Sequence, residues 1–413
     1  MFTFLTNCVT LSVTVITMKD NKNLYIGAYI LNKCARTRKH IRQIKKANID
    51  FMVSIDYNDK NTLDLFEKYS LGAIVNSVFP SWWGSDGENS GQMSDVNPIE
   101  AYKKSIANYQ PHNAVWGIDI GDEISAKDFK HINTVYEAHK NFFEDKIMYT
   151  NLYPNYGVNF NSAQTERQKQ WGCNTYKDYI EKYCKEVSLP YICFDHYPYC
   201  HNNILMFIEN LECVKEAAEK YCKSVYVVAQ SSSYSKDVFI TRSLLRKQIY
   251  IALGFNVKVI MWACYSAGWW YNHILDENGN KTKLYKDIKA VNTEAKKFFK
   301  EISQYKCHNS HILNSNTRIS TEFSVAESIE TKDDNLFLVC EAQSLQSEKM
   351  NAVYIVNISE NESDGKIILK CKNKLKVFTM DKNCKLKYNK KSGIYTLNLT
   401  QGYGAVIKSI LPE

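Results

Sequence analysis

The sequence lacks the patterns that mark several protein classes. Its 13 cysteines include no Cys-x-x-Cys spacing, so nothing supports a zinc site, and we expect no metal. A disulfide framework is not expected in a chain of 413 residues, so reduced thiols are the simplest interpretation. The 16 glycines form neither a Gly-x-Gly-x-x-Gly motif nor a phosphate-binding loop. We therefore expect no nucleotide and no organic cofactor.

Long runs of one kind of residue are also missing. The net charge is +8, but the lysines are spread along the chain and form no block of like charges. This excludes a basic arm for nucleic acid and indicates solvated surface. No stretch after the N-terminus approaches the ~18 apolar residues of a membrane span. Low-complexity linkers and internal repeats are absent as well. The composition is that of a globular protein, and its oligomeric state stays open.

Residues 1–20 allow two interpretations. The stretch Phe2–Met18 is uncharged and mostly apolar or threonine, but it lacks the basic region of a secretory signal. Val9, Leu11 and Val13 alternate with polar residues, which is the period of a strand. We expect an N-terminal strand or the remnant of a leader rather than a signal peptide.

Residues 21–305 repeat a pattern of an apolar run followed by an amphipathic stretch. Stretches such as Ala35–Ala47 and Ile204–Tyr221 separate the runs and are typical of helices. The eight runs are Leu24–Leu31, Ile49–Ile55, Leu71–Phe79, Val115–Ile120, Ile147–Leu152, Tyr191–Phe194, Val225–Ala229 and Val257–Trp262. Eight such units in about 280 residues predict an α/β fold, the (β/α)₈ TIM barrel, and disfavour a doubly wound sheet.

The pattern changes in residues 306–413. Short apolar runs recur there between turn residues. They are Leu336–Cys340, Ala352–Asn357, Lys366–Leu369, Leu375–Thr379, Tyr395–Leu399 and Ala405–Ile407. These runs predict a small C-terminal all-β sandwich domain. We expect this domain to brace the barrel, although it could also bind carbohydrate.

The residues that follow the predicted barrel strands are rich in acids, amides and aromatic rings. In a TIM barrel the active site lies at these strand ends. The candidates are Trp82, Trp83, Asp122, Glu123, Asn151, Tyr153, Asp195, His196, Tyr197, Gln230, Trp262 and Trp269. Carboxyl groups can transfer protons, amides can bind hydroxyl groups, and aromatic faces can stack on pyranose rings. The composition of this rim indicates a sugar site.

The pair Asp122–Glu123 is the most specific of these signals. Two acids at the end of an apolar strand repel each other and lose solvation, which raises at least one pKa. A carboxylic acid that is protonated near neutral pH is what protonation of a glycosidic oxygen needs. A plainer alternative makes Asp122 the cap of the next helix, with Glu123 in solvent.

The other candidates could also have structural roles instead of roles in catalysis or ligand binding. Asp195 could cap a helix or hydrogen-bond within the barrel rim. His196 is more often a structural histidine than a base. Trp262 could be core or a sugar platform, whereas the paired tryptophans Trp82–Trp83 and Trp269–Trp270 are expected to be loop aromatics that contact ligand.

Several segments resemble the barrel glycoside hydrolases of clan A, near the little-characterised relatives of the β-galactosidase-like families. They are GIDIGDE (Gly117–Glu123), NLYPNY (Asn151–Tyr156), FDHYPY (Phe194–Tyr199), VVAQS (Val227–Ser231), LDENGNKTKLYKDIKAVNTEAKKF (Leu275–Phe298) and YTLNLTQGYGAVIKS (Tyr395–Ser409). The resemblance covers residues 24 to 413 loosely, and it implies a glycoside hydrolase that acts on an oligosaccharide or polysaccharide.

The resemblance also implies where the acid/base and the nucleophile should lie. The acid/base of that superfamily is a Glu after strand four, usually preceded by Asn. Glu123 takes this place here, with Asp122 instead of the Asn, and Ile124 stands where relatives often have Pro. The usual nucleophile is a Glu that ends strand seven, but this sequence has Gln230. An amide cannot act as that nucleophile.

Three mechanisms remain open. In the first, a 2-acetamido group of the substrate attacks the anomeric carbon, Asp122 orients it and Glu123 protonates the leaving oxygen. In the second, Asp195 is the partner of Glu123 on a plain hexoside, as nucleophile or as base. A carboxyl separation of ~5 Å would then imply retention, and ~6.5–9.5 Å inversion. In the third, the site is degenerate and binds glycan without cleaving it.

A sugar isomerase or lyase on the same barrel is the least favoured alternative. Such enzymes usually carry several metal-binding acids and histidines, and only Asp195 and His196 come close to that. The reduced thiols favour a cytoplasmic location, whereas a polysaccharide substrate would favour secretion.

Overall fold

The computed structural model describes residues 23–80, 82–83, 93–107, 111–157, 171–200, 203–266, 268, 270–321, 325–347, 351–361 and 363–410. They form two compact units. The first consists mainly of Tyr25–Phe239 and Lys258–Lys286, and the second mainly of Ile240–Val257 and Asp287–Glu413. The strand or leader predicted for residues 1–20 lies outside the described residues, so that prediction stays open.

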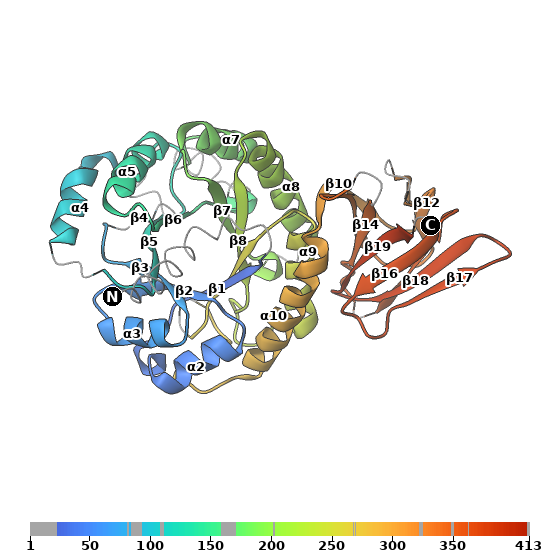
Figure 1. The fold of residues 1–413 in the computed structure, drawn as a ribbon, viewed down its shortest axis with the longest axis horizontal. Helices are drawn as coiled ribbons and strands as arrows, with labels where there is room; N and C mark the ends of the chain where they lie inside the picture. Colours follow the sequence, from blue (N-terminus) through green and yellow to red (C-terminus); the bar gives the residue numbers. More distant parts are fainter. Residues whose placement is uncertain are drawn as a thin grey trace, which may run out of the picture. The chain divides into compact units, whose positions relative to one another are not determined.

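Eight parallel strands form the nearly closed barrel of the first unit (Figure 1). They are β1 (Tyr25–Tyr29), β2 (Phe51–Asp56), β3 (Gly72–Asn76), β5 (Val115–Asp122), β6 (Ile147–Asn151), β7 (Tyr191–His196), β8 (Ser224–Gln230) and β9 (Val259–Ala263). The hydrogen-bonded order runs β6, β5, β3, β2, β1, β9, β8, β7. A bridge between Leu152 and Phe194 joins the two ends of this order. The (β/α)₈ barrel expected from the sequence is confirmed.

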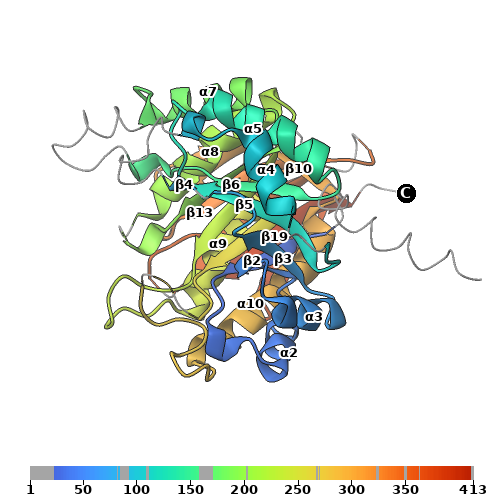
Figure 2. The ribbon, with the colours of Figure 1, turned by 90° about the vertical axis from the view of Figure 1, so that its left-hand side faces the viewer.

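Helices surround the strands of this unit (Figure 1). They are α2 (Arg38–Lys46), α3 (Lys60–Lys68), α4 (Pro98–Ile106), α5 (Phe129–Phe142), α7 (Tyr176–Glu186) and α8 (Ile204–Lys220). Helix α4 begins at Pro98 because Asn97 accepts hydrogen bonds from the backbone of Ile99 and Glu100, and proline suits the first helical position. Helices α4 and α5 pack against each other, as Figure 2 shows.

A two-residue strand, β4 (Trp82–Trp83), runs parallel to the end of β5. Its residues pair with Gly121 and Asp122. The sequence predicts both tryptophans in a loop, and that prediction is wrong. The pairing depends on Gly121, because a Cβ atom there would lie 2.6 Å from the carbonyl oxygen of Trp82. A requirement for close backbone approach cannot be read from hydrophobic periodicity.

We expect the substitution Gly121→Ala to separate β4 from β5, since a backbone atom blocks the new methyl group. Overpacking of this kind costs about 1–3 kcal/mol. Thermal unfolding and turnover of the variant would be compared with those of the parent. An unchanged melting temperature and an unchanged rate would show that the β4 contact is not important.

The second unit contains a sandwich of two five-stranded antiparallel sheets (Figure 1). One sheet has the order β10 (Tyr305–Leu313), β13 (Phe337–Ser344), β14 (Ala352–Asn357), β19 (Gly404–Ile410), β16 (Lys374–Thr379). The other has the order β11 (Arg318–Ile319), β12 (Ser328–Thr331), β15 (Asp364–Lys370), β18 (Ile394–Thr400), β17 (Lys385–Asn389). Buried side chains of both sheets, such as Val353 and Leu397, form one core. The predicted sandwich is confirmed.

Four strands of this sandwich correspond to no predicted apolar run: β10, β11, β12 and β17. Strand β11 has only two residues, and four of the five residues of β17 are exposed. Strands as short as β11 or as exposed as β17 carry little pattern in the sequence.

Two helices also belong to the second unit: α9 (Arg242–Leu253) and most of α10 (Lys283–Ile302). The Tyr354 hydroxyl donates to the carbonyl oxygen of Tyr250 over 2.7 Å, and Lys247 Nζ donates to that of Ser359 over 2.5 Å. Helix α9 is therefore hydrogen-bonded to the strands of the sandwich, although it follows β8 in the chain.

The described residues include no helix that is both long and apolar enough to cross a membrane. The twelve cysteines among them are free thiols, as the sequence predicts.

Candidate active site

Three polar side chains from adjacent strands meet at the C-terminal end of the barrel. Asn151 ends β6 and lies between Asp122, at the end of β5, and Asp195, near the end of β7. Its Nδ2 donates to Oδ1 of Asp122 over 2.9 Å and to Oδ1 of Asp195 over 2.8 Å. One amide nitrogen therefore joins the two carboxyl groups, so both lie in a single cluster. The parallel direction of the strands brings these positions together.

A chain of buried hydrogen bonds fixes the orientation of the Asn151 amide. The thiol of Cys193 donates to Asn151 Oδ1 over 3.4 Å, and Tyr149 contacts the same sulfur over 3.4 Å. The hydroxyl of Tyr149 shares a further hydrogen bond with that of Tyr29. Because its oxygen is occupied by the thiol, Asn151 presents its nitrogen to the two acids.

Burial changes the proton affinity of the acids in this cluster. Burial and then the charge of Asp122 raise the pKa of Asp195 to about 8, although hydrogen bonds from Asn151 and Tyr197 lower it. Burial also raises the pKa of Asp122 itself, and the hydrogen bond from Asn151 acts against this. Buried carboxyl groups this close favour shared protons over full ionisation. The raised pKa expected for the acids after strand four is thus found at Asp122.

A third carboxyl group, Asp119, belongs to the same cluster and was missed from the sequence. Burial and then the charge of Asp122 raise the pKa of Asp119 to about 7. In a regular strand, residues three apart face opposite sides. The register of β5 against β6 shifts between Asp119 and Gly121, which lets Asp119 approach Asp122. The available signal was an aspartate inside an otherwise apolar run.

Glu123 follows Asp122 directly and has an unusual backbone. Its φ is +49°, in the left-handed region that residues other than glycine seldom adopt. Its N–H donates to the carbonyl oxygen of Asn151 over 2.9 Å, so the same residue that joins the aspartates also holds the Glu123 backbone. The side chain is half-buried. The backbone of Glu123 is therefore held in place directly beside the cluster.

Aromatic side chains surround the acids. The ring of Tyr156, in the 3-10 turn η4 (Asn155–Gly157), has its centre 4.9 Å from that of His196, the residue after Asp195. Burial, then the charges of Asp195 and Glu123, raise the pKa of Tyr156. Tyr156 was not among the candidates. Tyr197 hydrogen-bonds Asp195, and its ring centre lies 4.3 Å from that of Trp270 in an edge-to-face contact.

The remaining candidates lie in different surroundings. Tyr153 is buried against Trp171, with ring centres 5.2 Å apart. His196 is buried, and its Nδ1 lies 3.1 Å from the side-chain oxygen of Asn210. The side chain of Trp262 has no exposed surface.

The tryptophans of β4 and of the loop after β9 are only partly described. The indole nitrogen of the half-buried Trp82 is enclosed and has no hydrogen-bond partner among the described residues. The side chain of Trp83 and all of Trp269 lie outside the described part of the structure. Their predicted contacts with ligand therefore stay predictions.

Gln230 ends β8 and is fully buried. Its side-chain oxygen accepts from the backbone N–H of Tyr199 over 2.9 Å, and its Nε2 donates to the carbonyl oxygen of Ser232 over 3.1 Å. Gln230 thus anchors the turn η5 (Pro198–Cys200), which directly follows Tyr197. A carboxylate could not make the second of these bonds, which gives a structural reason for the amide at this position.

Neither aspartate caps the helix that follows its strand, since Asp128 precedes α5 and Asn203 precedes α8. Asp195 lies within β7 and hydrogen-bonds within the rim of the barrel, as one of its two alternatives stated.

The raised pKa of Asp195 predicts a pH-dependent stability. The folded state holds this proton more tightly than the unfolded state, in which the pKa is about 4. Folding stability should therefore fall as the pH rises from about 4 to about 8. We expect Asp195→Asn to unfold about 3 °C or more above the parent at pH 8, with a smaller difference at pH 5.

Thermal unfolding at the two pH values tests this expectation. Asp334→Asn, at an exposed position, is the matched control and should change nothing. If Asp195→Asn melts at a lower temperature than the parent at pH 8, the pKa of Asp195 is not raised in the folded state.

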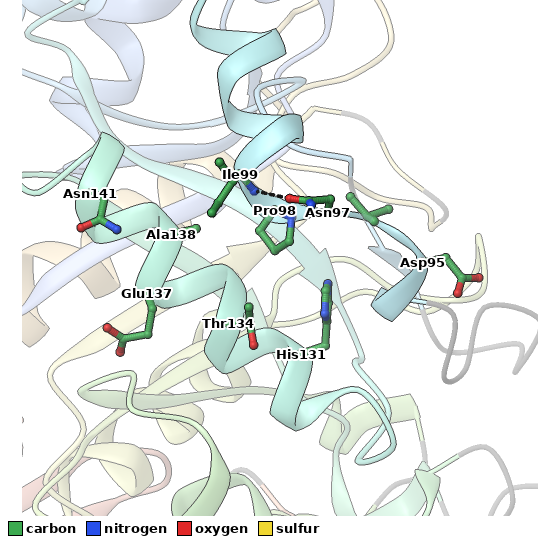
Figure 3. A pocket seen from close by; sticks show the side chains of 10 residues that line it. Asp95, Asn97, Pro98, Ile99, His131, Thr134, Glu137, Ala138 and Asn141 are labelled. Atoms are coloured by element: carbon green, nitrogen blue, oxygen red, sulfur yellow. Dashed lines mark hydrogen bonds between the residues drawn. The ribbon is translucent and has the colours of Figure 1, made fainter.

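A separate pocket of about 570 Å³ lies between the start of α4 and one face of α5 (Figure 3). Pro98 and Ile99 line it from α4, and His131, Thr134 and Asn141 line it from α5. It includes none of the acids of the cluster. Within the described residues no group of His, Cys, Asp or Glu side chains is arranged to hold a metal ion.

The fold and the site define a (β/α)₈-barrel protein with carboxyl groups gathered at the C-terminal ends of β5 and β7. No protein-family model matches the sequence, and no curated protein matches it either. Several solved structures are similar in shape. An endo-β-1,4-mannanase from Thermotoga petrophila has a TM-score of 0.47 and 10% identity, covering 95% of this chain and 96% of that chain.

Two further structures show similar values. The catalytic module of a family 98 glycoside hydrolase from Streptococcus pneumoniae TIGR4 has a TM-score of 0.44 and 8% identity, over 94% of this chain and 98% of that chain. Endo-glycoceramidase II from Rhodococcus sp. has a TM-score of 0.40 and 10% identity, over 95% of this chain and 99% of that chain. At this level of similarity, function has to be argued from the residues of this chain.

Proposed function

We propose that this chain is a glycoside hydrolase in which Glu123 is the general acid/base. The observation that carries the proposal is the hydrogen-bonded group of Asp122, Asn151 and Asp195 directly beside Glu123. Neighbouring carboxyl groups with different proton affinities are what glycosidic cleavage requires, because one must donate a proton while another carries charge.

The partner of Glu123 is, in this proposal, Asp122, acting on a 2-acetamido sugar. The substrate's own amide oxygen attacks the anomeric carbon, and Asp122 orients the amide group. The raised pKa of Asp195 supports this choice, because an acid with a pKa of about 8 is mostly protonated at neutral pH and is then a poor nucleophile. Gln230 supports it too, since its amide occupies the place of the usual nucleophile and is bound to the backbone.

A plain hexoside cleaved with Asp195 as the second carboxyl group is the alternative. The short link through Asn151 keeps Asp195 close to Asp122, so either acid could face the substrate. A catalytically degenerate barrel that only binds glycan is the third possibility.

Hydrolysis of a panel of aryl glycosides tests the proposal. The panel pairs galactosides and glucosides with their 2-acetamido counterparts. Cleavage of only the 2-acetamido sugars is the expected result, and cleavage of the plain hexosides would transfer the partner role to Asp195. If soluble polysaccharides bind but neither they nor the aryl glycosides are cleaved, the hydrolase assignment is wrong.

A further inference from the structure

Exposed apolar side chains gather on two loops of the barrel. Nine large apolar or aromatic side chains are exposed in the described part of the chain, and four of these lie on the loops after β8 and β9. They are Tyr234, Val238, Phe239 and Tyr271, with 54%, 37%, 67% and 44% of their surfaces exposed. We call these four residues the aromatic ledge. Apolar surface concentrated in this way marks a binding site more often than scattered single residues do.

The ledge is built on loops that are tied together. Ser233 and Tyr271 exchange two backbone hydrogen bonds, of 3.0 and 2.8 Å, so the two loops pair as a short antiparallel bridge. The Asn272 amide nitrogen lies within hydrogen-bond distance of the carbonyl oxygens of Lys236 (3.0 Å) and Val238 (2.7 Å). Ser233 Oγ also donates to the carbonyl oxygen of Val238. A fixed platform loses little conformational entropy when a ligand binds.

The ledge is continuous in the chain with the candidate active site. Trp270 precedes Tyr271 and packs against Tyr197, which hydrogen-bonds Asp195. The loops that carry the ledge leave the C-terminal ends of β8 and β9, the same end of the barrel at which Asp122 and Asp195 lie. A ligand that extends from the acids past Trp270 would therefore meet the ledge.

We propose that the aromatic ledge binds further sugar units of an extended glycan whose scissile bond lies at Glu123. This inference rests on the proposed hydrolase function and adds a substrate class, an oligosaccharide or polysaccharide rather than a small glycoside. Tyrosine and phenylalanine rings offer flat apolar faces for the C–H faces of pyranose rings. Lys236, whose Nζ lies 5.4 Å from the centre of the Tyr271 ring, adds a donor for hydroxyl groups.

The test compares long and short substrates in the full-length chain. The triple variant Tyr234→Ala, Phe239→Ala, Tyr271→Ala removes the rings, and Tyr388→Ala, on β17 and 50% exposed, is the control. The substrates are glycol chitin, galactomannan and xyloglucan, with their oligosaccharides of increasing length and the matching aryl monoglycosides. Binding to each polysaccharide is measured separately by affinity gel electrophoresis.

The triple variant should lose about tenfold or more in kcat/KM and in affinity on the long substrate, and keep its rate on the shortest substrate that the parent cleaves. Tyr388→Ala should match the parent on both. Equal losses on long and short substrates, or no loss on either, would contradict the proposal that the ledge binds glycan. A parent that is dimeric and a triple variant that is monomeric would also contradict it, because a second copy of the chain would then cover these rings.

The two proposals fail in different ways. If the chain binds a polysaccharide through the ledge but does not cleave it, the ledge is supported as a glycan-binding site and the hydrolase function is contradicted. If cleavage does not depend on substrate length, the hydrolase function is supported and glycan binding by the ledge is contradicted. A parent chain that neither binds nor cleaves any of these glycans overturns both.

Discussion

Replacement of Glu123 by Gln is expected to reduce turnover of glycosides with poor leaving groups by about 10³-fold, within the range typical of lost general acid–base catalysis. The amide has nearly the size and shape of the carboxylic acid but cannot give a proton to the glycosidic oxygen. The backbone bond from Glu123 to Asn151 does not involve the side chain, so the fold should remain intact. The rates of the parent and the variant are measured on the same substrate, and thermal unfolding checks that the fold of the variant is intact.

The leaving group separates a proton donor from a merely structural residue. Aryl glycosides whose phenol is strongly acidic need little protonation, so Glu123→Gln should cleave them with a much smaller loss. A disrupted site would instead lose activity equally on all leaving groups. Asp334→Asn serves again as the exposed acid-to-amide control. An unchanged rate on poor leaving groups would show that Glu123 is not the acid.

Asp122 and Asp195 are expected to respond differently to conversion to asparagine. Asp122→Asn should lower turnover of 2-acetamido substrates by about 10²-fold or more, because the amide no longer carries the charge that balances the developing positive charge. Asp195→Asn should have a smaller effect, since a protonated Asp195 already resembles the neutral amide in its hydrogen bonding to Asn151.

The pH dependence distinguishes the two mechanisms further. If Asp195 works in its protonated form, kcat/KM of the parent falls as the pH rises through about 8, and Asp195→Asn lacks that decline. If Asp195 is the nucleophile or base, kcat/KM instead rises through about 8, and Asp195→Asn is the inactive variant. A profile that is flat between pH 6 and 9 in the parent would contradict both assignments.

The barrel could be predicted because each of its strands is buried on both faces and therefore forms an apolar run. Strand β7, for example, has six buried residues, and β9 has five. The positions of Asp122, Asn151 and Asp195 follow from the same reasoning, since the ends of parallel strands converge. Strand β4 was not predictable in this way, because it exists through a backbone approach that only Gly121 permits.

The side chains around the cluster were harder to predict than the acids. A position at the end of a strand predicts that a residue lies near the rim of the barrel. It does not predict whether the side chain faces the ligand or packs against the neighbouring elements. Tyr153 and Trp262 were candidates and are buried, whereas Tyr156, from the turn after β6, lies near the acids. Asp119 joins the cluster because of a local register shift in β5, which leaves no trace in the spacing of apolar residues.

The hydrogen bonds of α9 determine how this chain can be divided. Helix α9 lies between β8 and β9 in the chain, yet its Lys247 is almost completely buried in a unit that consists mostly of residues Asp287–Glu413. No single cut in the polypeptide can separate the two units. A fragment that ends before β10 would leave the Lys247 ammonium without the Ser359 carbonyl oxygen, and a fragment that starts there would lack the helix that its Tyr354 hydroxyl bonds. Recombination of the barrel with a different C-terminal module would therefore require new residues inside the barrel sequence as well as a new junction.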